Sequence, residues 1–200
     1  MKIFGIVLAS IAVIVLMFVL SLIGAYNGLV SKDETVTSAW GQVENTYQRR
    51  NDLIPNLVNT VKGYATHEKS TFVEVTEARA KVSSIKINAE QLTKDAGMMK
   101  QFIEAQDQLG SALSRLMVVV EKYPDLKANQ NFLSLQDEIA GTENRIAVER
   151  KRYNETVVDL NKSIRVFPSN IIASMFGLEK RTYFEAEEKA KTAPVVDFSK

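Results

Sequence analysis

The chain has 200 residues, of which 24% are charged, and its formal net charge at pH 7 is +1. Basic and acidic residues are interspersed, so the chain lacks the basic footprint of a nucleic-acid-binding protein and we expect no nucleic-acid partner. The absence of cysteine excludes disulfides, thiolate metal sites and cysteine nucleophiles. Only 4 prolines and 9 glycines interrupt the chain, which favours long helices over many short strands.

The N-terminal segment predicts a membrane anchor. Residues 3–31 carry no charge, and residues 3–23 are almost wholly apolar. A helix needs about 20 apolar residues to cross a bilayer, so we predict a single transmembrane helix over residues 1–25. A cleaved signal peptide is the alternative, but its apolar region is about 7–15 residues long and ends in a small-x-small site. Ile23 stands three residues before the candidate cleavage point and does not fit that site.

Basic residues at the two ends of a span set its orientation. Lys2 and the amino terminus flank one end, and Lys32 alone flanks the other before Arg49. This small difference favours a cytoplasmic N-terminus, with the folded part on the opposite side of the membrane.

Beyond the span, apolar residues recur at alternating steps of three and four, which is the period of a helix and close to a heptad. The first stripe consists of Val36, Trp40, Val43, Tyr47, Ile54, Leu57, Val61, Tyr64, Phe72, Val75, Ala78 and Val82. It predicts a helical path from the span to about Ser83. We expect Pro55 either to kink this path or to begin a fresh helix capped by Asp52.

Two further stripes predict two further long helices. The second stripe comprises Leu92, Ala96, Met99, Ile103, Leu109, Leu113, Leu116, Val120 and Tyr123. The third comprises Phe132, Leu135, Ile139, Thr142, Ile146, Tyr153, Val157, Leu160, Ile164 and Phe167. Pro124 and Pro168 end these helices, because proline disfavours helical geometry at the residue before it. Ser169 is predicted to cap a short fourth helix that stops at Gly177.

These patterns predict an all-α fold, in which an N-terminal transmembrane helix is followed by an elongated antiparallel three- to four-helix bundle. We assign residues 1–25 to the anchor, 26–182 to the bundle and 183–200 to a C-terminal tail. In the tail, residues 185–191 predict a charged helical turn, and the apolar residues expected to dock back on the bundle are Val195, Val196 and Phe198. Tyr26 is expected to close the span as an interfacial aromatic.

Several longer strings resemble the LemA family. The first is Arg49-Arg50-Asn51-Asp52-Leu53-Ile54-Pro55-Asn56-Leu57-Val58, followed by Thr60-Val61-Lys62-Gly63-Tyr64-Ala65 and His67-Glu68. The second is Tyr123-Pro124-Asp125-Leu126-Lys127-Ala128-Asn129, followed by Asn131-Phe132, Leu135-Gln136, Thr142-Glu143-Asn144-Arg145-Ile146-Ala147, Arg150, Tyr153 and Asn154. The third is Phe167-Pro168-Ser169-Asn170 with Phe176-Gly177. The resemblance covers nearly the whole chain. It implies a helical bundle with a single-pass anchor in the bacterial plasma (inner) membrane, and it implies no particular chemistry.

The residues themselves predict no catalytic, cofactor-binding or metal site. His67 is the only histidine, and a zinc site built on it would lack the paired histidines that such a site uses on a helix. The sequence contains neither a strand-to-helix elbow for a serine nucleophile nor a glycine-rich phosphate loop. We therefore expect that the protein is not an enzyme.

Some polar residues lie on or beside the apolar stripes, namely Arg50, Glu68, Gln106, Glu149 and Arg150. A buried charge needs partners. If the three long helices run up, down and up, Glu68 and Arg150 lie at one level with Gln106 nearby, so we predict a mid-bundle cluster of these three. We expect the cluster to set the register of the helices, and a ligand site is the alternative.

A second hypothesis places Arg49, Arg50 and Asp52 beside the turn at residues 123–126. Helix carbonyls are exposed where the second helix ends, and a guanidinium satisfies such carbonyls while pairing with Asp125. The alternative is that Arg49 and Arg50 contact anionic lipid head groups, which a separation of roughly 30 Å or more from the end of the anchor disfavours.

A tether and a bundle surface without chemistry favour a non-catalytic scaffold or adaptor of the bacterial cell envelope, with protein partners and self-association expected. The alternative is a sensory or regulatory accessory protein that transmits a signal to a partner such as a protease or kinase.

Overall fold

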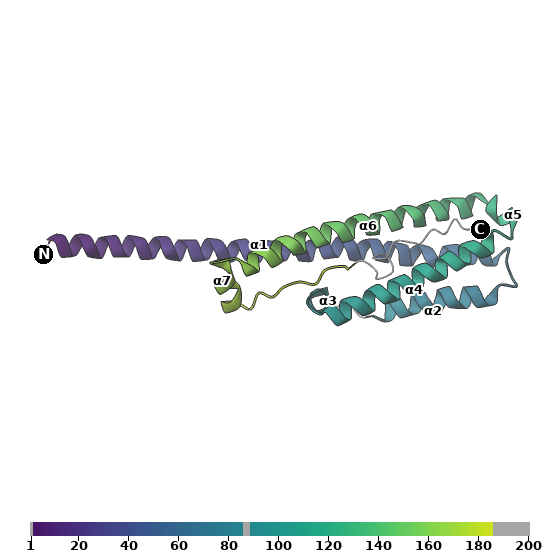
Figure 1. The fold of residues 1–200 in the computed structure, drawn as a ribbon. Helices are drawn as coiled ribbons and strands as arrows, with labels where there is room; N and C mark the ends of the chain where they lie inside the picture. The colour runs from purple at the N-terminus through teal and green to yellow at the C-terminus, as the bar shows by residue number, and fades with distance from the viewer. Residues whose placement is uncertain (1, 86–88, 186–200) are drawn as a thin grey trace, which may run out of the picture.

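The computed structural model describes residues 2–85 and 89–185, and every regular element in these ranges is a helix. In chain order the elements are α1 (Lys2–Lys62), α2 (Lys69–Ser84), α3 (Ala89–Lys94), α4 (Ala96–Val120), α5 (Pro124–Lys127), α6 (Gln130–Arg165) and α7 (Ser169–Met175). Figure 1 shows an elongated molecule in which the first part of α1 extends alone beyond one end of the bundle. The predicted all-α fold is confirmed.

Helix α1 contains the predicted anchor in its first part and forms one of the helices of the bundle in its second part. It runs without a break for 61 residues, and the large apolar side chains between Phe4 and Leu20 are exposed. Its most apolar 18-residue window has a mean hydropathy of 3.2, and none of that window is buried. The segment is therefore long and apolar enough to cross a bilayer, and exposed apolar surface on this scale is typical of contact with lipid.

The chain reverses direction once more than the sequence patterns predict. Helix α1 ends at Lys62, and α2 begins at Lys69 and returns beside α4. The expected helical path to Ser83 is therefore wrong, because a turn at residues 63–68 divides it. The turn buries the side chain of Ala65, and the Val61 carbonyl accepts hydrogen bonds from the backbone of Tyr64 and Ala65, at 3.0 and 2.9 Å. As a result α6 runs antiparallel to α1 along its length (Figure 1).

Pro55 lies inside α1, and Asp52 does not begin a new helix. A proline inside a helix leaves the carbonyl four residues earlier without its usual donor, and here that carbonyl belongs to Asn51. Arg79 of α2 supplies the replacement, because its Nε donates to the Asn51 carbonyl oxygen at 3.1 Å. The side chain of Asn51 also faces α2, where Nδ2 donates to Ser83 Oγ at 3.3 Å. The proline thus creates a docking point for the returning helix.

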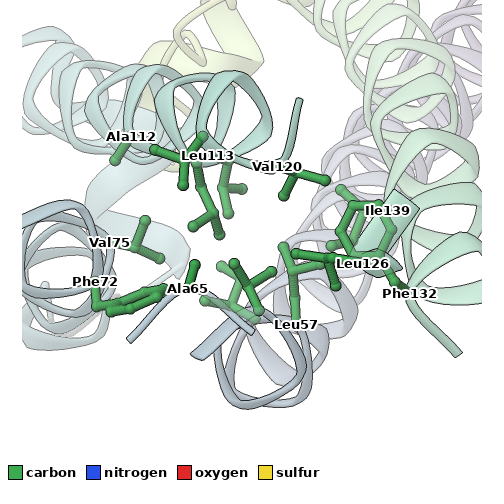
Figure 2. Close-up of a cluster of buried hydrophobic side chains, with 14 of the residues drawn as sticks. Leu57, Ala65, Phe72, Val75, Ala112, Leu113, Val120, Leu126, Phe132 and Ile139 are labelled. Atoms are coloured by element: carbon green, nitrogen blue, oxygen red, sulfur yellow. The ribbon is translucent and has the colours of Figure 1, made fainter. Parts of the chain in front are cut away.

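The apolar stripes meet in three clusters along the bundle. The cluster farthest from the span joins α1, α2, α4, α5 and α6, and Figure 2 shows Leu57 of α1 between Val75 and Leu113 on one side and Leu126 on the other. The second cluster surrounds Trp40, which is 1% exposed. The third lies next to the span and buries Leu29 against α7.

The short helix α7 and its stop at Gly177, whose φ is +68°, agree with the sequence. Ser169 is the first residue of α7, and the capping position belongs to Pro168, so the predicted cap is wrong. Residues 178–185 then run without regular structure back along the bundle, and Phe184 is buried there. The predicted docking residues Val195, Val196 and Phe198 lie outside the described residues, as does most of the predicted turn at 185–191.

The bond between Arg79 and the Asn51 carbonyl predicts a coupling between Arg79 and Pro55. We expect Arg79→Ala to destabilise the bundle by about 1–3 kcal/mol, because it leaves a half-buried carbonyl without a donor. The same change costs less in a Pro55→Ala background, where the restored backbone N–H donates to the Asn51 carbonyl within the helix. Urea denaturation of the four proteins in detergent, followed through Trp40 fluorescence, measures the difference. Equal costs in both backgrounds would contradict the coupling.

Candidate functional site

Arg50 occupies a position of the buried stripe of α1 and is only 4% exposed. Its guanidinium donates to Glu143 Oε1 of α6 at 2.6 Å and to Gln106 Oε1 of α4. The same group lies 5.3 Å from the centre of the Tyr47 ring, and burial raises the pKa of the Tyr47 phenol. These contacts form a polar layer of Arg50, Gln106 and Glu143 between the far and middle apolar clusters.

The predicted cluster of Glu68, Gln106 and Arg150 is wrong in two of its three members. Glu68 lies at the far turn, 4.0 Å from Lys122, and Arg150 stacks over the Phe184 ring at 4.7 Å. The prediction assumed that the first and third long helices run parallel. The additional reversal at residues 63–68 makes them antiparallel, so Glu143 rather than Arg150 lies beside Gln106.

Glu149, the remaining polar residue noted beside the stripes, pairs with Arg152 at 2.9 Å. The placement of Arg49, Arg50 and Asp52 at the turn near Asp125 is also wrong. Arg49 lies 3.9 Å from Glu138 in an exposed pair, and Asp52 accepts from Gln48 within α1.

The far corner of the bundle is joined by other residues. Asn129 Nδ2 donates to the Tyr64 hydroxyl at 2.9 Å, linking the α1–α2 turn to the start of α6. Both residues belong to the strings that resemble the LemA family, so two of those strings meet at this corner.

A second polar cluster fixes residues 178–185, which we call the strap. Arg181 is 5% exposed, and its guanidinium makes two hydrogen bonds of 2.9 Å to the Asp33 carboxylate of α1 and one of 2.9 Å to Thr93 Oγ1 of α3. Its backbone exchanges two further bonds of 2.9 Å with the Asn161 amide of α6. One strap residue therefore ties three helices together.

The end of the strap completes the middle apolar cluster. Phe184 stacks on Trp40 with ring centres 5.7 Å apart, and its backbone exchanges hydrogen bonds with the Asn154 amide at 2.8 and 2.9 Å. The Tyr153 hydroxyl donates to the Thr182 carbonyl at 2.9 Å, and burial raises the pKa of this phenol well above its usual value.

Sequence reasoning missed the strap cluster altogether. One signal was available, because Asn154 and Asn161 lie seven residues apart, each directly after a residue of the third stripe. Amides at such positions need buried partners, and the strap backbone supplies them.

Both polar clusters link helices. Among residues 2–85 and 89–185 no group of three His, Asp or Glu side chains is arranged to hold a metal ion. His67 is exposed in the turn after α1 rather than on the first helix where the sequence placed it.

A surface hollow of about 500 Å³ lies between α2 and α4, and the Glu74–Arg115 ion pair of 2.7 Å bridges those two helices there.

The polar layer predicts that Arg50 matters more for stability than Arg150. Arg50→Ala leaves buried Gln106 without its partner and removes the packed stem of the arginine, so we expect a loss of about 2 kcal/mol or more. Arg150→Ala removes one cation–π contact, worth about 1 kcal/mol. Thermal unfolding in detergent, followed by circular dichroism, ranks the two variants. A larger loss for Arg150→Ala would contradict the assignment.

The strap cluster predicts that Arg181 controls the surroundings of Trp40. Arg181→Ala removes the side-chain hydrogen bonds of the guanidinium and leaves Asp33 without its counter-ion, so we expect the strap to detach and Phe184 to leave the indole ring. Trp40 emission then shifts to longer wavelength, and chymotrypsin cleaves after Tyr183 faster. Lys180→Ala, which changes an exposed neighbour, is the control. An unchanged emission spectrum in Arg181→Ala would show that other contacts hold the strap.

The chain is similar to known proteins over most of its length. The model of the LemA family matches residues 39–198. Magnetosome protein MamQ 2 of Paramagnetospirillum magneticum is 30% identical over 197 residues, which cover 91% of this chain and 72% of that protein. MamQ of Magnetospirillum gryphiswaldense is 28% identical, covering 90% and 71%, and protein LemA of Metamycoplasma hominis is 25% identical, covering 83% and 71%. Because the family model matches most of its length, the chain belongs to the LemA family.

Proposed function

We propose that this protein is a membrane-tethered, non-catalytic helical scaffold or adaptor of the bacterial cell envelope. The observation that carries the proposal is the continuity of α1, which joins an exposed apolar span to the core of the bundle without a linker. A flexible linker would leave the bundle free to turn relative to the membrane. A continuous helix instead holds the bundle in a fixed arrangement relative to the span, which suits a protein that presents a surface at a set height above the membrane.

The interior of the bundle supports this role. Arg50 and Arg181, the two arginines buried in the described part of the chain, have protein partners on other helices. They therefore brace the structure and are not free to bind a substrate. The relatives include magnetosome proteins and a LemA protein.

We further propose that the protein spans the plasma (inner) membrane once, with the bundle on the extracytoplasmic side. The basis is the small excess of positive charge before the span. Lys2 and the amino terminus precede the span, whereas Lys32 is the only basic residue that follows it before Arg49.

A sensory or regulatory accessory protein is the second candidate, and one contact favours it. Asp33 lies on α1 shortly after the span and holds Arg181 of the strap. A movement of the span would therefore act directly on this contact, and through the strap on Phe184. In this role the strap would pass a change at the membrane to a partner.

Capture of the full chain from native membranes tests the proposal. The protein is solubilised in mild detergent, sized and analysed for stoichiometric partners, and protease protection in sealed vesicles of known orientation is measured on the same membranes. We expect a large assembly that contains several copies, and cleavage of the bundle from the extracytoplasmic side.

One defined protein partner at equal stoichiometry, with no self-assembly, would favour the regulatory candidate instead. A monomer without any stoichiometric partner would contradict both. Detergent-solubilised Arg181→Ala is the matched variant, because a scaffold keeps its assembly when the strap detaches whereas strap-dependent signalling loses its partner.

A further inference from the structure

An uncharged segment surrounds α7, in a bundle that is otherwise rich in charge. Residues 166–178 contain no charged residue, and Arg165 and Glu179 flank them. Five large apolar side chains of this segment are 46–80% exposed, namely Val166, Phe167, Ile171, Met175 and Phe176. In the rest of the bundle, exposed large apolar side chains are scattered singly over the described residues. The α7 surface, as we call these five residues, is therefore a concentrated apolar patch.

The opposite side of α7 is packed on α1 at the point where the span ends. Ile172 and Ala173 are buried with Leu29, and the partly buried residues around them include Leu22 and Tyr26 of α1. The rings of Tyr26 and Phe176 lie with their centres 4.4 Å apart. Figure 1 shows α7 at the end of the bundle from which α1 emerges alone.

The length of the span sets the height of α7 relative to a bilayer. A hydrocarbon core about 30 Å thick takes about 20 residues of helix. If it begins at Ile3, it ends near Ile23, and Leu22 and Tyr26 then lie at the boundary between hydrocarbon and head groups. Because α7 packs on these same residues, its exposed apolar side chains lie at that boundary as well.

We propose that residues 166–177 enter the lipid interface beside the span and form a second, non-spanning contact with the membrane. The occupant of the α7 surface is lipid, because that surface continues the apolar surface of the span at the same level. The positions of the charged residues near α7 agree with a place at the boundary between hydrocarbon and head groups. Lys32 and Asp159 form an ion pair of 2.8 Å on the bundle side of α7, and exposed Arg165 borders the patch, where a basic side chain reaches head groups.

Two membrane contacts at one level have a mechanical consequence. A single span leaves a protein free to rotate about the helix axis and to tilt. A second contact on one side of that helix restricts both motions, so the bundle leaves the membrane with a preferred face turned toward the lipid. The inference rests on the span proposed above and adds an orientation that the span alone does not provide.

Spin labels on single cysteines test the inference in the full chain, which has no cysteine of its own. Met175→Cys, at a position 75% exposed, reports on the α7 surface, and Phe167→Cys, at 80%, reports on its other end. Leu16→Cys marks the span, and Val118→Cys, at an exposed apolar position of α4, marks the water-facing bundle. Each protein is reconstituted into vesicles of phosphatidylcholine and phosphatidylglycerol, after circular dichroism confirms that it is folded.

Collision rates with oxygen, which concentrates in lipid, and with a water-soluble nickel chelate give the depth of each label. We expect labels at 175 and 167 to collide with the nickel chelate several-fold less often than the label at 118, and with oxygen more often. The label at 16 is expected to show the strongest preference for oxygen.

Each other result overturns the inference in a recognisable way. Labels at 175 and 167 that match the label at 118, while the label at 16 lies in lipid, would show that the span stands and that α7 remains in water. A label at 175 shielded from both reagents would show a protein cover, and spin–spin broadening would identify it as a second copy. A label at 16 exposed to the nickel chelate would overturn the span itself, and the proposed function with it.

Discussion

Helix α1 passes from lipid into water as one uninterrupted helix, and the remaining helices pack on the part of it that lies in water. Its first part exposes apolar side chains all around, whereas its second part buries one stripe against α4 and α6. A helix crosses from lipid to water without unsatisfied peptide groups, because it bonds its own backbone. Pro55 leaves one carbonyl of α1, that of Asn51, without its helical donor. This carbonyl lies in the part of α1 that belongs to the bundle, where Arg79 of α2 supplies the missing donor. The defect in α1 thus becomes the contact that positions its neighbour.

Much of this fold follows from apolar periodicity, and the errors have one origin. The stripes correctly predicted α1 in its buried half, α4 and α6, because packing positions recur with the helical period, and the proline and glycine signals around residues 168–177 predicted α7. The turn at residues 63–68 was missed because Val61, Phe72 and Val75 remain apolar on both sides of it, and Gly63 alone resembles a tolerated helical glycine. Pro55 offered a stronger break signal at the wrong place. The carbonyl that Pro55 leaves without a backbone donor is satisfied by Arg79, a contact distant in sequence that no local pattern encodes.

That one missed reversal explains the misassigned polar cluster, while the strap was hidden for a different reason. Arg50 and Gln106 were correctly recognised as polar residues on buried stripes, but choosing Arg150 as a partner required the direction of α6, which the turn inverts. The strap has no apolar period, so no sequence pattern singled out Arg181. Only Asn154 and Asn161, two amides beside the third stripe, offered a signal for the extended backbone that covers α6.

The continuity of α1 also fixes a distance. From Tyr26 at the lipid boundary to Lys62, the helix rises roughly 55 Å. The far tip, where Tyr64 meets Asn129, therefore stands several Debye lengths from the head groups at physiological ionic strength, since one such length is about 8 Å. A molecule held at that tip is screened from the charge of the lipids below it. The continuous helix α1 thus sets the distance between the apolar segment at its base and the far tip of the bundle.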